Sequence, residues 1–328
     1  LRNWSSASGD TEPFNCSNCD RLTIRDMTIV AGGPVRSTSD AIDLDDGDDN
    51  VIERVKITSA RGRAIVFDGK GTENGGHADG NIIRNCVITG TIPYDGIQML
   101  ASNDNRIEGC TITGVGRHGI YAVKSSDSAD QPNKPSNNNV IVGNYVETSA
   151  QHGIAVSSGN WNLISGNTIV TNDRSGISIT GSSAYSCDDN VVEYNTSNEN
   201  LEYGLAIVSS GCHRTVVRDN SFSGNAKGDV VDHGTDTIYS SSDNTPTPTP
   251  DDSTTPTATA TATETPTATL TPTPVSSSSF TVISIADAYV YESNSTSNYG
   301  NSSALRTDGS PIMRSYLRFE VPSFSGSV

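Results

Sequence analysis

A short fragment that recurs along the chain constrains the fold more than any other feature. It reads Gly-Ile-x-apolar in its clearest copies, and its apolar anchors are Ile42, Ile65, Ile97, Ile120, Ile154, Ile177 and Leu205. The anchors are spaced by 23, 32, 23, 34, 23 and 28 residues, so a period of 23 residues carries extra residues in every second interval. Such a period, built from short β-strands with Asn and Gly at the turns, predicts a parallel β-helix.

A second fragment, Asn-x-Ile-x-x-Asn-x-Ile, alternates with the first one. Successive coils of a β-helix stack at ~4.8 Å, so equivalent positions should form inward ladders of like residues. One predicted ladder contains Ile52, Ile83, Ile107, Ile141, Ile164, Val192 and Val217. The other contains Met27, Val55, Cys86, Cys110, Asn144, Asn167, Asn195 and Asn220. Stacked Asn side chains can bond one another and the turn backbone, which favours this arrangement.

These repeats resemble the right-handed parallel β-helix repeats of the pectin-lyase-like superfamily over roughly Leu22 to Asp232. The resemblance implies an all-β, single-stranded right-handed parallel β-helix, which we place at residues 1–240 with about eight coils.

Composition changes after residue 240. Residues 241–278 are dominated by Thr, Pro, Ala and Ser, which predicts an extended spacer of the kind found in secreted modular proteins. The motifs Asp287-Ala-Tyr289-Val, Asn298-Tyr-Gly300 and Tyr316-Leu-Arg-Phe319 follow. They resemble the disaggregatase-related, alginate-binding type of carbohydrate-binding β-sandwich, so residues 279–328 are interpreted as a truncated module of that kind.

Charge and hydropathy exclude some partners. The formal net charge of −17 disfavours nucleic acid, because phosphate binding needs clustered Lys and Arg. No run of 18 apolar residues occurs, so no membrane span is predicted in this fragment. We expect a monomer, located outside the cell or at its surface. The chain starts at Leu1 without a hydrophobic leader, and we expect its targeting signal to be missing.

The six cysteines form three pairs. Cys187 and Cys212 precede equivalent positions on adjacent coils, which predicts a disulfide that suits a secreted protein. Cys86 and Cys110 occupy adjacent rungs of an inward ladder, where stacked thiols and a disulfide are the alternatives and thiols are favoured. The pair in the fragment CSNC lacks a second such pair, so a zinc site is not expected.

Acidic residues gather on the early coils. Asp45 and Asp68 share one column on adjacent coils, and Asp43 lies about 8 Å from Asp68 by strand geometry. Three carboxylates this close need a cation or raised pKa values. Asp45, Asp46 and Asp48 are therefore candidate calcium ligands, and chelation should then weaken glycan binding. The alternative is an acidic turn in an acidic protein.

Two enzyme families share parts of this pattern. Asp40-Ala-Ile-Asp43-Leu-Asp45 resembles the Tyr-Gly-Phe-Asp-Pro-His motif of mannuronan epimerases, and Ala64-Ile-Val-Phe-Asp68 resembles their next strand. The resemblance implies catalytic roles for Asp43 and Asp68, whereas Asp40 and Asp45 replace the family's tyrosine and histidine. Polygalacturonases are also similar, through the fragments SDAID and RHG, but their paired aspartates are replaced by Arg-Ala.

Proton transfer needs further groups beside the acidic cluster. His118 and Tyr121 are candidate acid and base residues, because removal of the C5 proton of a uronate requires such a pair and a cation for its carboxylate. Asp95 is also a catalytic candidate. The candidate substrate-binding residues are Arg63, Gln98, Arg117, Lys124 and His152. The histidines have an alternative interpretation as solvent-exposed turn residues.

These residues favour a secreted carbohydrate-active protein that acts on an acidic, uronate-containing polysaccharide by β-elimination or epimerisation. Two alternatives stay open. The protein could be a glycan-binding surface or adhesion protein without catalysis. It could also be an inverting hydrolase, since a carboxylate separation of ~8 Å falls in the inverting range.

Overall fold

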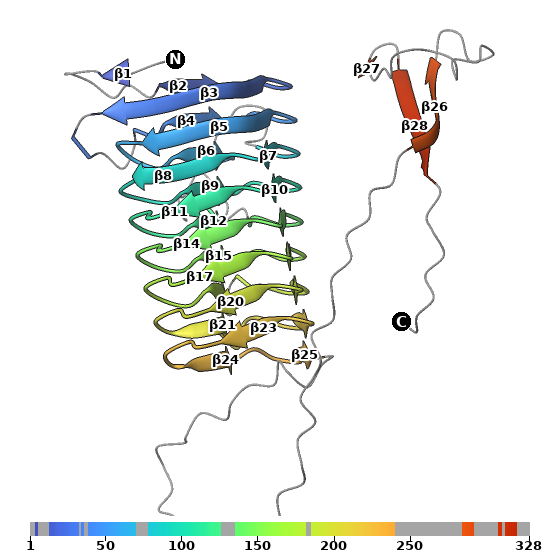
Figure 1. The fold of residues 1–328 in the computed structure, drawn as a ribbon. Coiled ribbons are helices and arrows are strands. Elements are labelled where there is room, and N and C mark those ends of the chain that lie inside the picture. The colour runs from blue at the N-terminus through green and yellow to red at the C-terminus, as the bar shows by residue number, and fades with distance from the viewer. Residues whose placement is uncertain are drawn as a thin grey trace, which may run out of the picture. The chain divides into compact units, whose positions relative to one another are not determined.

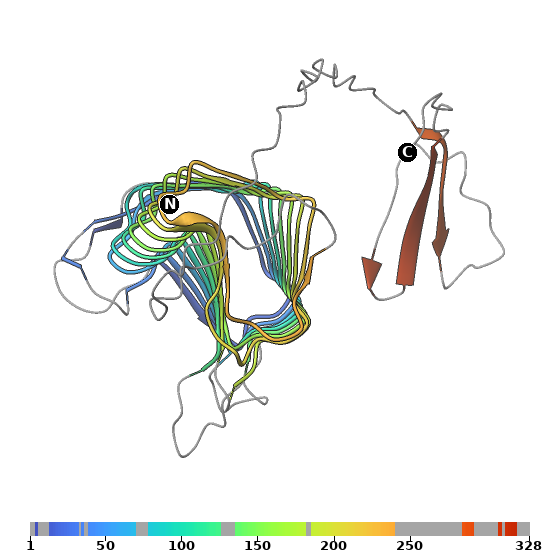
Figure 2. The same ribbon diagram turned by 90° about the horizontal axis from the view of Figure 1, so that it is seen from below.

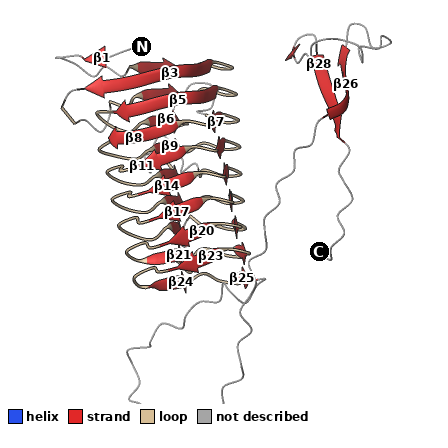
Figure 3. Ribbon diagram, in the orientation of Figure 1, coloured by secondary structure: helices blue, strands red, loops and turns tan. Residues whose placement is uncertain are grey.

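The structure is a computed structural model. It describes residues 13–31, 34–35, 39–69, 78–125, 135–181 and 185–239 with their side chains, and the backbone alone of residues 4–5, 32, 284–291, 308–309 and 312–319. Contacts divide the chain into two compact units, Leu1–Thr254 and Thr255–Val328. Within the described residues every regular element is a β-strand (Figure 3).

The Gly-Ile fragments form a parallel sheet of nine strands in which each strand pairs with the equivalent strand of the next coil (Figure 1). The register joins Ile42 to Ile65 and Ile65 to Ile97, as the repeat spacing predicts. The strands are β2 (Phe14–Ser17), β4 (Ile42–Asp45), β6 (Ile65–Asp68), β9 (Ile97–Leu100), β12 (Ile120–Val123), β15 (Ile154–Ser157), β18 (Ile177–Thr180), β21 (Tyr203–Ile207) and β24 (Gly228–Asp232).

The remaining strands of the first unit form a parallel sheet of 16 strands, with two short strands per coil in most coils. Viewed along the stacking axis, the coils superimpose closely (Figure 2). The strands are β1 (Trp4–Ser5), β3 (Thr23–Gly32), β5 (Val51–Ser59), β7 (Ile82–Arg84), β8 (Val87–Thr91), β10 (Arg106–Glu108), β11 (Thr111–Thr113), β13 (Val140–Val142), β14 (Tyr145–Glu147), β16 (Leu163–Ser165), β17 (Thr168–Val170), β19 (Val191–Glu193), β20 (Thr196–Asn198), β22 (Val216–Arg218), β23 (Ser221–Ser223) and β25 (Ile238–Tyr239). The predicted parallel β-helix is confirmed.

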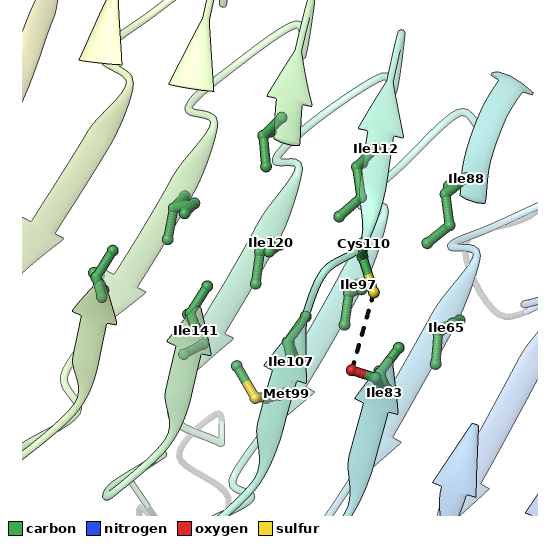
Figure 4. Packing of buried hydrophobic residues seen from close by; sticks show 14 of the residues in the cluster. Ile65, Ile83, Ile88, Ile97, Met99, Ile107, Cys110, Ile112, Ile120 and Ile141 are labelled. Atoms are coloured by element: carbon green, nitrogen blue, oxygen red, sulfur yellow. Dashed lines mark hydrogen bonds between the residues drawn. The ribbon is translucent and has the colours of Figure 1, made fainter. Parts of the chain in front are cut away.

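The core is a stack of ladders. Ile107 pairs in register with Ile83 and Ile141 on the neighbouring coils, and all three side chains are buried. Figure 4 shows these residues facing Ile97 and Ile120 of the other sheet. Each coil buries only a few apolar side chains, so the core grows by stacking coils and not by widening them.

Ladders of asparagine side chains provide hydrogen-bond partners for the backbone groups of the turns. The backbone N–H of Asn144 donates to Oδ1 of Asn167 at 2.9 Å, and Asn167 in turn donates to Asn195 at 2.9 Å. The side-chain amide of Asn167 donates to the carbonyl of Ile141 at 2.9 Å. The predicted Asn ladder is thus confirmed. A second buried ladder serves another turn and consists of Asn50, Asn81, Asn105, Asn139, Asn162 and Asn190.

Two of the three cysteine pairs are arranged as predicted. Cys187 and Cys212 form a disulfide with their Cα atoms 4.5 Å apart, whereas Cys86 and Cys110 are buried free thiols. The structure adds a bond that the sequence did not indicate, between Cys16 and Cys19, with a Cα separation of 5.9 Å.

The second unit has a small antiparallel sheet in the order β26 (Ser284–Tyr291), β28 (Ile312–Phe319) and β27 (Asp308–Gly309). The predicted spacer and its boundaries at 240 and 278 lie outside the described residues, as do the loops between these strands. A search of the described residues for helices long and apolar enough to cross a membrane finds none.

Candidate functional site

The nine-stranded sheet aligns the predicted site residues. Asp45 pairs directly with Asp68, as predicted. One outward column of this sheet then runs from Asp43 through Val66 and Gln98 to Tyr121. The longer intervals of the repeat predict insertions after Asp68 and Lys124, at the border of this surface. They fall on residues 70–77 and 126–134, which lie outside the described residues.

A tight corner before each of these strands places the residues next to it. A Cβ atom on Gly153 would approach Cγ2 of Ile169 to 2.3 Å and the carbonyl oxygen of Gly176 to 2.8 Å. In this coil only glycine fits. Most other coils also have glycine at the corner, whereas the coils of β4 and β6 have alanine, and the shared corner holds the preceding residue at the same place in successive coils. We call the two residues before this corner in each coil, from Gly62-Arg63 to Lys227-Gly228, the edge strip.

Asp95 is the most buried charge of the edge strip, with 0% of its surface exposed. Its Oδ2 lies 3.5 Å from Nη1 of Arg117 and 3.7 Å from Nε of Arg63, and its Oδ1 accepts the backbone N–H of His118 at 3.1 Å. Burial raises the pKa of Asp95, while Arg117, the His118 N–H and Arg63 oppose this effect. Asp95, a catalytic candidate from the sequence, therefore has no exposed surface and lies between two arginines, which it positions.

Three rings lie in contact next to this carboxylate. The His118 ring is tilted against the Tyr121 ring, with 4.5 Å between ring centres, and is stacked on the His152 ring at 5.5 Å. His118 is only 6% exposed, so its interpretation as a solvent-exposed turn residue is wrong. Burial lowers the pKa of His118 to about 3, aided by His152, Arg117 and Arg174. His118 is therefore neutral at neutral pH.

Tyr121 and the neighbouring cations complete the cluster. Burial raises the pKa of Tyr121, against a hydrogen bond with Ser157 and the charge of Arg117. The Arg117 guanidinium lies 5.6 Å from the centre of the Tyr121 ring. The ammonium group of Lys124 lies 4.1 Å from the centre of the Tyr185 ring.

Several buried polar atoms of this surface make no hydrogen bond with the described chain. They are Gln98 Oε1, His118 Nδ1, His152 Nδ1 and Ser175 Oγ. Leaving such a group unsatisfied costs about 1–3 kcal/mol, and these four lie on consecutive coils. Together they form a line of buried polar groups that extends along several coils.

The acidic residues predicted to bind calcium make hydrogen bonds with the protein itself. No three His, Cys, Asp or Glu side chains of the described residues are grouped so as to hold a metal ion. The carboxylate of Asp48 accepts the backbone N–H of Asp79 at 2.8 Å, and that of Asp45 accepts the hydroxyl of Ser17 at 3.4 Å. Asp46 lies in a turn with φ of 49°. Calcium binding stays a prediction from the sequence.

Asp48 belongs to a further ladder on the outer turn. Each member's side chain accepts the backbone N–H of the next coil, through Asp79, Asn103, Asn137, Asn160 and Asp188. This role explains an acidic residue here without a metal.

Sequence reasoning missed Arg174 and Gln151. Arg174 precedes Ser-Gly-Ile as Arg117 precedes His-Gly-Ile, so an alignment of the repeats could have found it. The backbone confirms the equivalence, because Gln151 donates to the carbonyl of Arg117 at 3.0 Å and Arg174 donates to that of Gln151 at 3.2 Å.

Comparison with protein families gives two matches. Residues 14–186 and 133–245 match the family described as right handed beta helix region, and residues 278–328 match carbohydrate-binding module family 96. Both resemblances drawn from the sequence, to right-handed β-helix proteins and to a carbohydrate-binding module, are confirmed. The search of curated proteins gave no match.

Several solved structures share the architecture at low similarity. The A-module of the Azotobacter vinelandii mannuronan C-5 epimerase AlgE4 is 16% identical, with 68% of this chain and 75% of that chain covered and a TM-score of 0.43. An exopolygalacturonase from Thermotoga maritima is 16% identical, with 61% and 55% covered and a TM-score of 0.42. A tailspike protein of Escherichia coli bacteriophage HK620 is 12% identical, with 63% and 39% covered and a TM-score of 0.47.

Proposed function

The chain belongs to the right-handed β-helix family, and we propose that it acts on an acidic, uronate-containing polysaccharide by removing the C5 proton of a uronate. The observation that carries the proposal is the contact of His118 with Tyr121, 4.5 Å between ring centres, beside the guanidinium of Arg117. β-Elimination and epimerisation both begin with loss of this proton, so both need a base, an acid and a cation for the sugar carboxylate.

His118 is the base in this proposal. Its low pKa results from burial and from the positive charges of His152, Arg117 and Arg174. A uronate carboxylate bound beside these groups would offset the cations and raise the pKa of His118 toward the range of an effective base. The substrate would thereby activate the base that removes its proton.

Tyr121 is the acid. Burial raises the pKa of its hydroxyl, so it keeps its proton at neutral pH. It could deliver that proton to the departing glycosidic oxygen in elimination, or to C5 from the opposite face in epimerisation. Arg117 neutralises the sugar carboxylate, which lowers the energy of the carbanion-like state. Asp95 holds Arg117 and Arg63 in place.

We further propose that the protein is a monomer outside the cell or at its surface. The disulfides Cys16–Cys19 and Cys187–Cys212 support this location, because such bonds persist in oxidising compartments. A glycan-binding role without catalysis is the second candidate. It is favoured by the match to carbohydrate-binding module family 96 and by the low exposure of His118.

The test is hydrogen exchange at C5. The full chain is incubated in deuterated buffer with polygalacturonate, polymannuronate, polyguluronate and hyaluronan, and the H5 signal is followed by proton NMR. Ultraviolet absorbance of the unsaturated product and the number of reducing ends are measured in parallel. Loss of H5 signal is expected, and the His118→Gln and Tyr121→Phe variants should slow it roughly 10²–10⁴-fold.

Tyr194→Phe is the matched control, because this tyrosine is exposed on the turn after β19. Its rate should equal that of the unchanged protein. New reducing ends without H5 loss would replace the proposal with hydrolysis by Asp43 and Asp68. Binding without any reaction would leave a glycan-binding protein.

A further inference from the structure

Positive charges recur on every second coil of the edge strip. These residues are Arg63 before β6, Arg117 before β12, Arg174 before β18 and Lys227 directly before β24. The intervening coils contribute Tyr94-Asp95, Gln151-His152 and Glu202-Tyr203 at the same places. Cationic coils therefore alternate with coils that lack a cation in the strip, just as short and long intervals alternate between the repeat anchors.

The four cations differ in how far the protein itself neutralises them. Arg63 lies 3.3 Å from Asp40 and 3.7 Å from Asp95, and Lys227 binds Glu202 at 2.7 Å. Arg117 has one longer contact, at 3.5 Å to Asp95. Arg174 is exposed and forms no ion pair within 4.0 Å among the described residues; its charge lowers the pKa of Glu202 on the next coil, but that carboxylate is bound by Lys227. Arg117 and Arg174 are thus the cations most available to a ligand.

Arg117 and Arg174 lie in one column of the edge strip, because Gln151 donates its backbone N–H to the carbonyl of Arg117 and Arg174 donates to that of Gln151. In agreement with this, the charges of both arginines lower the pKa of His118, and that of Arg174 lowers the pKa of His152. The coil between the two arginines contributes Gln151 and His152, and Nδ1 of His152 is buried without a hydrogen-bond partner in the described chain. Uncharged polar groups therefore separate two guanidinium groups.

The distance between the arginines sets the spacing of the acidic groups that they can bind. Neighbouring coils are ~4.8 Å apart, so the two arginines are ~10 Å apart along the axis. One coil is about as long as one pyranose in an extended chain, so two coils span a disaccharide. A homopolyuronate would put a carboxylate against Gln151 and His152, where no cation balances it. A polymer with an uncharged sugar opposite Gln151 and His152 has no carboxylate at that position, so each of its carboxylates can pair with an arginine.

We propose that the edge strip binds a polysaccharide in which a uronate alternates with an uncharged sugar, with Arg117 and Arg174 each binding one carboxylate. This assignment rests on the proposed function, because it takes the edge strip as the surface that binds the glycan. Gln151 and His152 then contact the hydroxyl or amide groups of the uncharged sugar.

The test is a binding comparison on the full chain at one salt concentration. Hyaluronan oligosaccharides, which alternate glucuronate with N-acetylglucosamine, are titrated by calorimetry against oligogalacturonate and oligomannuronate of the same length. The alternating oligosaccharide should bind about tenfold more tightly than either homopolymer, the effect expected of one charge-assisted contact. Equal or tighter binding of the homopolymers would overturn the assignment.

Variants of the edge strip test whether the preference for the alternating oligosaccharide arises there and not in the C-terminal module. Arg174→Gln should weaken binding of the alternating oligosaccharide about tenfold and should bring it to the level of the homopolymers. Arg25→Gln, at an exposed arginine of β3 in the other sheet, is the matched control and should bind as the unchanged protein does. Equal affinity of the Arg174 variant and the control would also overturn it.

The two proposals can fail separately. If the homopolyuronates bind most tightly and also show H5 exchange, the proposed function is retained and the preference for an alternating polysaccharide is rejected. Preferential, Arg174-dependent binding of the alternating oligosaccharide with no H5 exchange on any polymer would retain the alternation and reject the catalytic proposal.

Discussion

Asp95 is a carboxylate without exposed surface. Its interactions with neighbouring groups do not fully compensate for the hydration that its charged form loses on burial. Its pKa is raised even though Arg117, the His118 N–H and Arg63 all favour the charged form, because the loss of hydration outweighs them. Such an arrangement is costly to the fold and keeps two arginines in a defined position. That combination is characteristic of a positioning residue in a binding surface.

The pH dependence of stability should reveal this cost. The folded pKa of Asp95 is above its unfolded value, so the penalty is present above the folded pKa and disappears as the pH falls through it. Asp95→Asn lacks the penalty at every pH. The unfolding free energy of the variant minus that of the unchanged protein should therefore decrease on acidification, as measured by urea unfolding over a pH series. A difference independent of pH would contradict this account.

Asn167 shows how one side chain stabilises three coils. It accepts the backbone N–H of Asn144, donates to the carbonyl of Ile141 and donates to Oδ1 of Asn195. We expect Asn167→Leu to lower the unfolding free energy by ~1–3 kcal/mol, because buried turn amides lose their partners. Thr168→Leu, at the adjacent outward-facing residue of β17, should change it much less. Comparable losses in urea unfolding would mean that the ladder adds no stability.

At the level of the strand, the corner before β15 requires close approach of two backbones. Gly153→Ala should be strongly destabilising, because the new methyl group would overlap Ile169 and the carbonyl of Gly176. Gly143→Ala is the contrasting variant, since Gly143 has φ of 63° and no atom near its missing side chain. It should lose only about 1–2 kcal/mol from backbone conformation. Thermal unfolding of both variants measures the two losses of stability. Equal losses would mean that the space around residue 153 is not the limiting factor.

For the whole molecule, the two compact units predict two unfolding events. A chain that ends at Thr254 retains every strand of the β-helix, because those strands pair only with one another in the described structure. Calorimetry of this shortened chain should show the β-helix transition at the temperature found in the full chain. A clear decrease would indicate that the second unit stabilises the first. The shortened chain should also keep the glycan preference attributed to the edge strip.

The fold was predictable because its information is local and repeated. Ile107 and Ile141 had to be buried neighbours once the period was known, since stacking at a fixed rise brings equivalent positions together. The same reasoning located the Cys187–Cys212 bond and the Asn ladder. The Cys16–Cys19 bond was missed because two cysteines within a single coil are not related by the period.

The repeat period was enough to predict the register, the ladders and the column of each candidate residue. The packing of the folded chain establishes which of these residues are buried and which charges are already neutralised. Asp48 and Asp95 are both aspartates on the same β-helix, yet one accepts a turn N–H and the other lies between two arginines. The period places each of them in a column but does not give its environment, because desolvation and charge pairing depend on how side chains from neighbouring coils pack around each group in space.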